Sequence, residues 1–244
     1  MQGERHMKSY ARVLGAIILA VFLAAATVCA QGVSIQSIQG DVSIRHGVTE
    51  QWTTVARGDV LKPDDTMKTG PRGSVVLLAA TQPQRRITLP ANVMVDVADI
   101  RDLTPEELML KLTMEKVRGS SYRPTDDPAA PNAAVVHGAN REQAPALAEN
   151  DPVSGVQEWN GVRVLFDNGF YSTCALKGME LFRLYPDTHG SFDRRFIVAR
   201  SLELARLRGE ALDEYTSIQE LAGLTPDQRS LLAQHINQVR GPSK

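Results

Sequence analysis

The sequence predicts an α+β protein in separate domains, with an N-terminal all-β sandwich or roll followed by C-terminal α-helical hairpins. Between about residues 32 and 117, short apolar runs alternate with polar residues and turn signals, which is typical of strands. From about residue 156 the apolar positions recur with the helical period. A proline-rich segment separates the two regions. The expected divisions are 1–30, 31–118, 119–155 and 156–244.

Residues 1–30 have the pattern of a secretory signal peptide. Three basic side chains precede an uncharged apolar run, and Val28-Cys29-Ala30 follows it with the small residues expected before a cleavage site. We expect cleavage after Ala30 and a periplasmic or secreted mature protein. An uncleaved membrane anchor is one alternative, although the run is shorter than the roughly 20 residues of a spanning helix. A lipoprotein at Cys29 is the other, although Val28 is larger than the residue that lipidation favours there.

The charge balance of the mature chain does not favour nucleic acid or anionic lipid as a partner. Without residues 1–30, 24 basic and 27 acidic side chains remain, which leaves a small net negative charge. We also expect no membrane span after cleavage. Because Cys174 is then the single remaining cysteine, no intrachain disulfide can form, and the fold has to be held by burial.

The β region reads as several short strands. Its turn signals are Gly-Asp, Pro-Asp and Gly-Pro pairs, which break the apolar runs at short intervals. Asp59, Asp64 and Asp65 flank glycine or proline, and we expect them to serve turns rather than a cation or catalysis. The expected strands include Val42 to Ile44, Ser74 to Ala80, Ile87 to Leu89 and Val93 to Val97.

The stretch after Ile100 carries two conflicting signals. A period of two is seen in Leu108, Leu110, Leu112 and Met114, which alternate with Met109, Lys111, Thr113 and Glu115. This period favours a strand from about Leu108 to Val117. Thr104-Pro105-Glu106-Glu107, however, has the form of a capping box at a helix start. We expect the strand, with the helix as the alternative.

Residues 119–155 are expected to be a flexible linker. Five prolines lie among alanine, asparagine, aspartate and serine, and Val135-Val136 is the main apolar cluster. A segment with so little to bury cannot repay its ordering entropy. The two flanking domains should then move independently.

Five short antiparallel helices are expected after the linker. Glycine, proline and aspartate punctuate the apolar stripes, and Thr225-Pro226-Asp227-Gln228 is a capping box at the start of the last helix. The expected helices contain Val162 to Phe166, Ala175 to Leu184, Phe196 to Ala205, Leu212 to Leu221 and Leu231 to Val239.

The β region resembles the FecR domain, a periplasmic domain of iron-transport signalling regulators that also occurs in other envelope proteins. The resemblance lies in Gly40 to Gly47, Trp52, Gly58 to Leu61, Asp65 to Gly70 and Ser74 to Leu77. A later family strand has only an echo in Val135 to Ala139. At most twelve residues precede the apolar run, so we do not expect the cytoplasmic segment by which such regulators hold a sigma factor.

The helical region resembles tetratricopeptide repeats, which are helix pairs that bind other proteins. Gly169 to Ala175 and Lys177 to Pro186 are similar to the second helix of a repeat, with Cys174 at the small-residue position. Gly209 to Tyr215 suggests a second copy with a shorter turn. Each helix pair exposes an apolar stripe that a neighbouring pair covers, and the last helix would cap the array.

No residue pattern predicts a catalytic, cofactor or metal site. The four histidines of the mature chain, at 46, 137, 189 and 235, lie in different segments, and no metal-binding spacing occurs. Cys174 is expected to be a core residue rather than a nucleophile. We therefore expect a protein without enzymatic activity.

The expected function is that of an exported scaffold or adaptor that binds an envelope protein. Four arginines on the first helices of the predicted pairs are candidate partner-binding residues: Arg163, Arg194, Arg195 and Arg200. Arginine pairs well with carboxylates, so an acidic segment on the concave surface is the expected ligand. The alternatives are a cell-wall glycan bound by the β domain, or a FecR-type signalling component.

Overall fold

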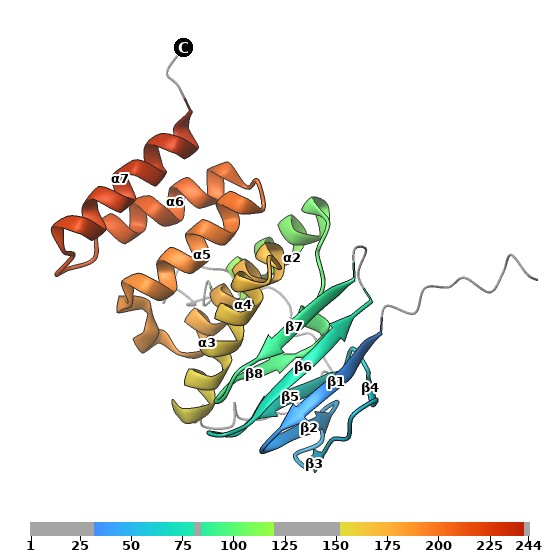
Figure 1. Cartoon of the computed structure of the whole chain (residues 1–244). Helices are drawn as coiled ribbons and strands as arrows, with labels where there is room; N and C mark the ends of the chain where they lie inside the picture. The colour runs from blue at the N-terminus through green and yellow to red at the C-terminus, as the bar shows by residue number, and fades with distance from the viewer. Residues whose placement is uncertain (1–31, 81–83, 120–151, 242–244) are drawn as a thin grey trace, which may run out of the picture. The chain divides into compact units, whose positions relative to one another are not determined.

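The protein is described here by a computed structural model that covers residues 32–80, 84–119 and 152–241 (Figure 1). These described residues belong to one compact unit. The expected signal peptide, residues 120–151 of the expected linker, and the possible FecR-like strand at Val135 to Ala139 lie outside the described residues.

Within residues 32–80 and 84–119, eight strands form two antiparallel sheets of four strands each. One sheet has the order β4-β1-β6-β7 and the other β3-β2-β5-β8. Strands come first and helices follow, which confirms the α+β class. The strands are β1 Val33–Gln39, β2 Val42–His46, β3 Trp52–Thr54, β4 Val60–Leu61, β5 Asp65–Thr69, β6 Ser74–Ala79, β7 Arg85–Leu89 and β8 Met94–Asp96.

The sheets bury alternate side chains, as their sequences require. Along β6, Val75, Leu77 and Ala79 are buried while their neighbours are half-buried, because successive side chains in a strand point to opposite faces. Met67 of β5 and Ile87 of β7 join the same core. Each fully buried side chain of this size contributes about 1.5–3 kcal/mol to folding.

Two of the three turn aspartates have the role that the sequence predicts. The Asp59 carboxylate accepts a hydrogen bond of 2.8 Å from the backbone N–H of Ala56. Asp65 accepts one of 2.7 Å from the N–H of Lys62, and its second oxygen lies 2.7 Å from His46 Nδ1. Both carboxylates therefore hold turns between strands.

The strand expected from Leu108 to Val117 is wrong, because this stretch lies inside helix α2, Pro105–Gly119. Thr104 accepts a hydrogen bond of 3.2 Å from the N–H of Glu107, and Pro105 occupies the first helical position. Leu108 and Leu112 are both buried, and their spacing of four residues places them on one helical face. The capping signal was the correct one.

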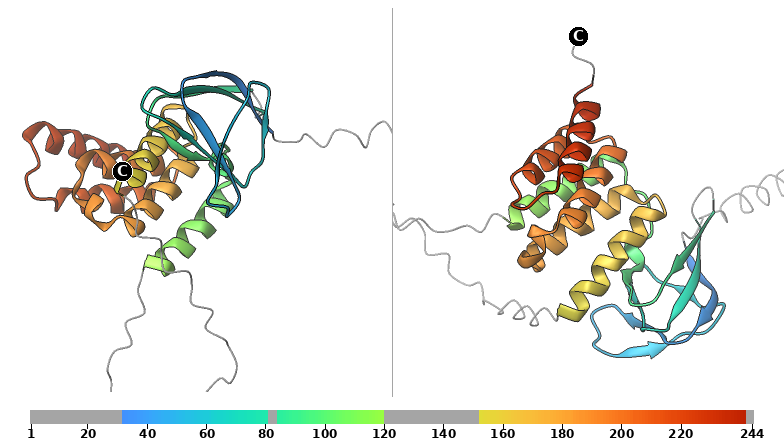
Figure 2. Two further views of the ribbon diagram at one scale, coloured as in Figure 1. Left: turned by 90° about the horizontal axis from the view of Figure 1, so that it is seen from below. Right: turned by 60° about the vertical axis from the view of Figure 1, so that its left-hand side comes forward.

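Helices α3 to α7 confirm the five helices that the sequence predicts, and they lie side by side in Figure 2. Each packs on the next along the chain, and Gly178 lets α4 and α5 approach so closely that a Cβ there would lie 2.4 Å from Val198. The described residues also contain two short 3₁₀ helices, η1 Val97–Asp99 and η2 Pro186–Gly190. The five helices are α3 Pro152–Asp167, α4 Tyr171–Leu184, α5 Phe192–Leu204, α6 Arg208–Gln219 and α7 Pro226–Arg240.

The first helices of this array also pack against the strands. Gly161 of α3 lies on the backbone of β8, where a Cβ would come within 2.0 Å of the Met94 carbonyl oxygen. Nearby, the Asn160 side chain donates a hydrogen bond of 2.8 Å to the carbonyl of Asn92. The two regions that the sequence assigns to separate domains are therefore in direct contact.

Within the described part of the chain, no helix is both long enough and apolar enough to cross a membrane.

Candidate functional site

Helices α3, α5 and α7 line one side of the helical array. Pockets between α3 and α5 and between α5 and α7 open on this side, and Phe196 of α5 contacts His235 of α7 with ring centroids 5.2 Å apart. Helices α2, α4 and α6 line a different pocket. We call the first set of surfaces the α3/α5/α7 face.

Arg195 lies in the interior, unlike the exposed residue that the sequence suggests. Its exposed fraction is 9%. Its Nε lies 2.9 Å from Glu214 Oε1, and its guanidinium also donates to Ser217 of α6. This ion pair joins α5 to α6, so Arg195 has a structural role and is removed from the candidate surface.

The other three predicted arginines lie nearer the surface but in different surroundings. Arg194 packs over the ring of Trp159 at 5.2 Å from its centroid. Arg200 forms an ion pair of 2.5 Å with Glu203. Arg163 is exposed and lines the small α3–α5 pocket. The structure therefore does not gather the four candidates into one basic patch.

A basic pocket of about 470 Å³ lies between the end of α5, the start of α6 and the end of α7. Arg200, Arg206 and Arg208 line it together with Glu203, which leaves an excess of two positive charges. Arg206 and Arg208 are exposed and form no ion pair with any other described residue. Sequence reasoning missed both, although they surround the break between two apolar stripes, where exposed residues are common.

A hydrogen-bond network fixes the wall of this basic pocket. Glu203 accepts hydrogen bonds from Tyr215 Oη at 2.7 Å and lies 3.1 Å from His235 Nδ1. Burial alone would raise the pKa of Glu203, but the hydrogen bonds from Arg200 and Tyr215 outweigh it and lower the pKa. Burial and the Glu203 carboxylate together raise the pKa of Tyr215. Glu203 is therefore ionised at neutral pH, and it holds Arg200 in place.

The α3–α5 pocket is smaller, at about 150 Å³, and more apolar. Phe166 of α3 and Phe196 and Ile197 of α5 line it, with Arg163, Asp167 and Asp193 at its rim. It can take an apolar side chain, while the basic pocket can take a carboxylate. The two pockets share α5, which separates them by about two helical turns along that helix.

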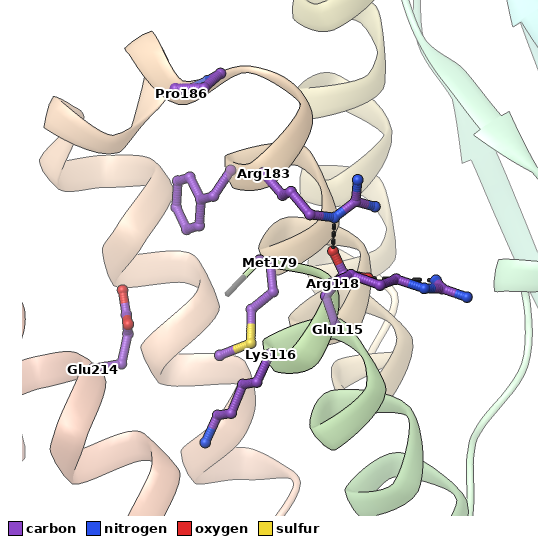
Figure 3. A pocket seen from close by; sticks show the side chains of 9 residues that line it. Glu115, Lys116, Arg118, Met179, Arg183, Pro186 and Glu214 are labelled. Carbon is purple, nitrogen blue, oxygen red and sulfur yellow. Dashed lines mark hydrogen bonds and ion pairs between the residues drawn. The ribbon is translucent and has the colours of Figure 1, made fainter. Parts of the chain in front are cut away.

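Figure 3 shows the pocket of about 510 Å³ lined by α2, α4 and α6. Met179 points into it, and Phe182 and Pro186 add apolar surface. The Arg183 guanidinium donates to Glu115, which also pairs with Arg118 at 3.6 Å. Because Glu115 pairs with two of the arginines in its lining, this pocket has a smaller excess of positive charge than the basic pocket.

Lys177 of α4 is the centre of a charged cluster where the helices meet the strands. Its Nζ lies 2.9 Å from Asp96 of β8 and 3.2 Å from Glu180. Burial alone would lower the pKa of Lys177, but the surrounding carboxylates outweigh burial and raise the pKa. Burial raises the pKa of Asp99 to about 7. The cluster lies in a contact between elements, and we assign it a structural role.

Cys174 has the environment of a core residue. It is fully buried, its thiol donates to the Val162 carbonyl at 3.4 Å, and Ser201 donates to it at 3.1 Å. Burial raises the pKa of its thiol to about 12, so the reactive thiolate is scarce at neutral pH. The described residues contain no group of three histidine, cysteine, aspartate or glutamate side chains suited to a metal ion.

No protein-family model, curated protein or solved structure matches the chain.

Proposed function

We propose that this protein is an exported adaptor of the cell envelope, and that its α3/α5/α7 face binds an acidic segment of another protein. The observation that carries the proposal is the basic pocket, where the guanidinium groups of Arg206 and Arg208 form no ion pair with any residue that the structure describes. Arginine is the residue best suited to pair with carboxylates in a fixed geometry. The similarity of the helices to tetratricopeptide repeats supports the same reading.

The arrangement of pockets indicates how such a segment binds. A carboxylate enters the basic pocket and replaces water around Arg206 and Arg208. An apolar side chain about two helical turns away fills the space between Phe166 and Phe196. Charge at the rim speeds association and fixes orientation, while burial of the apolar side chain contributes more of the affinity.

Site-specific photocrosslinking in cells tests this proposal. A photoreactive amino acid at Arg208 is expected to capture one protein partner in high yield. The same amino acid at Arg72, which is exposed in the turn between β5 and β6, serves as the control and should not capture it. Capture of one partner from Arg72 but not from Arg208 would contradict the proposal.

The proposed location depends on the signal-peptide pattern of residues 1–30. The mature chain is expected to begin at Gln31 and to carry no lipid. Intact-mass measurement of the protein recovered from the envelope fraction tests this. A mass that corresponds to an acylated Cys29, or to a retained N-terminus, would contradict it.

A second candidate function is binding of a cell-wall glycan by the strands. Trp52 of the edge strand β3 is half-exposed, with Lys68 4.3 Å and Arg45 5.3 Å from its ring centroid. An aromatic ring beside cations suits an acidic glycan. If this function is correct, residues 32–244 should sediment with insoluble peptidoglycan, and Trp52→Ala should release them.

A further inference from the structure

Helix α2 has an apolar stripe on the side that faces away from the core. Leu108 and Leu112 are buried against the rest of the protein. Leu110, Met114 and Val117 are instead 63%, 48% and 67% exposed. Their spacing of four and three residues places them in one row along the helix.

Such a row is uncommon on a helix that is exposed to water. Single exposed apolar side chains are normal, but a contiguous apolar surface usually marks a site of association. Met109 is also partly exposed, at 40%, but it lies about 100° around the helix from Leu110 and outside this row. Leu110 and Met114 lie on the opposite side of α2 from the buried Leu108 and Leu112.

The charges of α2 are divided between its two ends. Glu106 and Glu107 lie in the first turn, and Lys116 and Arg118 lie in the last. Neither Glu106 nor Lys116 pairs with a charged group among the described residues. A second α2 that runs antiparallel would bring the acidic turn of each helix opposite the basic turn of the other, while a parallel helix would bring like charges together.

We propose that the α2 stripe is the contact of a homodimer, in which two copies of α2 pack antiparallel about a two-fold axis. In this arrangement Leu110 of one protomer faces Met114 of the other, and the two-fold axis repeats this contact. Both protomers use the same surface, and Met114 of the first faces Leu110 of the second, which is the geometry of an isologous interface. Met114 adapts well to such a contact because its side chain is flexible.

The dimer does not involve the α3/α5/α7 face, so the inference stands independently of the proposed function. The contact is one helix pair, which is smaller than a typical stable interface. We therefore expect a reversible dimer with a dissociation constant on the order of 10 μM.

Sedimentation velocity of residues 32–244 tests the proposal. The wild-type unit is expected to shift from monomer to dimer between roughly 1 and 200 μM. Leu110→Asp should weaken the dimer by about 100-fold or more, since it places a charge in the apolar contact. The control is Leu231→Asp, which changes an exposed leucine of α7 and should leave the dimer intact.

A charge exchange tests the antiparallel arrangement without altering the stripe. Glu106→Lys and Lys116→Glu should each weaken the dimer, by about 3- to 10-fold, because each brings like charges together. An equimolar mixture of the two variants should restore association, because basic ends then face acidic ends. Circular dichroism of each variant checks that α2 remains folded.

Two results would overturn the proposal. One is a wild-type unit that stays monomeric up to about 500 μM, which would leave residues 120–151 or another protein as the occupant of the stripe. The other is a dimer that Leu110→Asp does not weaken. If the mixture of charge variants associates no better than either variant alone, the antiparallel arrangement is wrong.

Discussion

At the scale of single residues, Gly161 determines how closely α3 approaches the strands. The backbone of α3 touches the Met94 carbonyl at this position, and a Cβ would lie 2.0 Å from the oxygen. The backbone at Gly161 belongs to a helix and the Met94 carbonyl to a strand, so a shift of either would disturb the packing of regular structure.

We predict that Gly161→Ala lowers the free energy of unfolding by about 1–3 kcal/mol, because the added methyl group forces α3 away from β8. Gly209→Ala is the matched control. A Cβ at Gly209 meets no atom within 4 Å, so alanine should raise the free energy of unfolding by about 0.5–1 kcal/mol. Urea unfolding measures both. Equal effects of the two substitutions would show that α3 and β8 are not in close contact.

The raised pKa of Asp99 leads to a prediction about how stability depends on pH. Burial raises its pKa from the ordinary 3.8 to about 7. Between about pH 4 and pH 7, Asp99 is therefore more often protonated in the folded protein than in the unfolded chain, and the contribution of this one group to stability falls as the pH rises through that window. Lys177 and Lys111 oppose the effect of burial, and Asp96 and Glu180 add to it.

Asp99→Asn removes this titration. The difference in the free energy of unfolding, variant minus wild type, is expected to be larger at pH 8 than at pH 5. Denaturation at the two pH values measures it, and the other titrating groups cancel in the difference. If the difference is the same at both pH values, the pKa of Asp99 is not raised in the folded protein.

Residue-scale predictions from sequence succeed where the local pattern decides the outcome. The turn roles of Asp59 and Asp65 and the burial of Cys174 follow from neighbouring glycine or proline and from helical spacing. The buried ion pair of Arg195 with Glu214 could not be predicted, because it depends on how α5 and α6 meet. The basic pocket with Arg206 and Arg208 could not be predicted for the same reason, because it depends on how α5, α6 and α7 meet.

At the scale of elements, α2 shows how two local signals compete. The alternation of apolar and polar residues from Leu108 to Val117 resembles a strand because an exposed apolar stripe interleaves with a buried one. Packing on the rest of the protein accounts for the buried stripe, and the proposed dimer contact would account for the exposed one. The cap at Thr104, together with Pro105, decides in favour of the helix.

Thr104→Ala should lower the free energy of unfolding by about 1 kcal/mol, because the N–H of Glu107 loses its acceptor. Thr113→Ala is the control within the same helix. The Thr113 hydroxyl donates to the Met109 carbonyl in the helix interior, where alanine is the better helix former. Stability should be unchanged or slightly higher. If Thr104→Ala leaves the free energy of unfolding unchanged, this cap does not stabilise α2.

At the scale of the whole molecule, contacts between strands and helices predict that the described residues unfold together. Sequence composition suggested instead two domains that move independently. Composition reveals the segment between the domains but not the surfaces that meet, such as Gly161 on Met94 or Lys177 beside Asp96.

The chain has two tryptophans, one in each region: Trp52 in β3 and Trp159 in α3. Trp52→Phe and Trp159→Phe variants therefore report on the helices and on the strands separately. We expect each fluorescence transition in urea to coincide with the circular dichroism of the same variant. Transitions that separate within one variant would support independent domains.

The central claim is that the basic pocket holds an acidic segment of a protein partner. The most direct measurement is co-purification of the envelope partner with the wild-type protein and with Arg206→Glu/Arg208→Glu. Both arginines are exposed and unpaired among the described residues, so the double variant should keep the wild-type melting temperature within a few degrees. We predict that the amount of co-purified partner falls at least tenfold, because two negative charges then face the partner's carboxylates. Full retention of the partner by a folded double variant would contradict the claim.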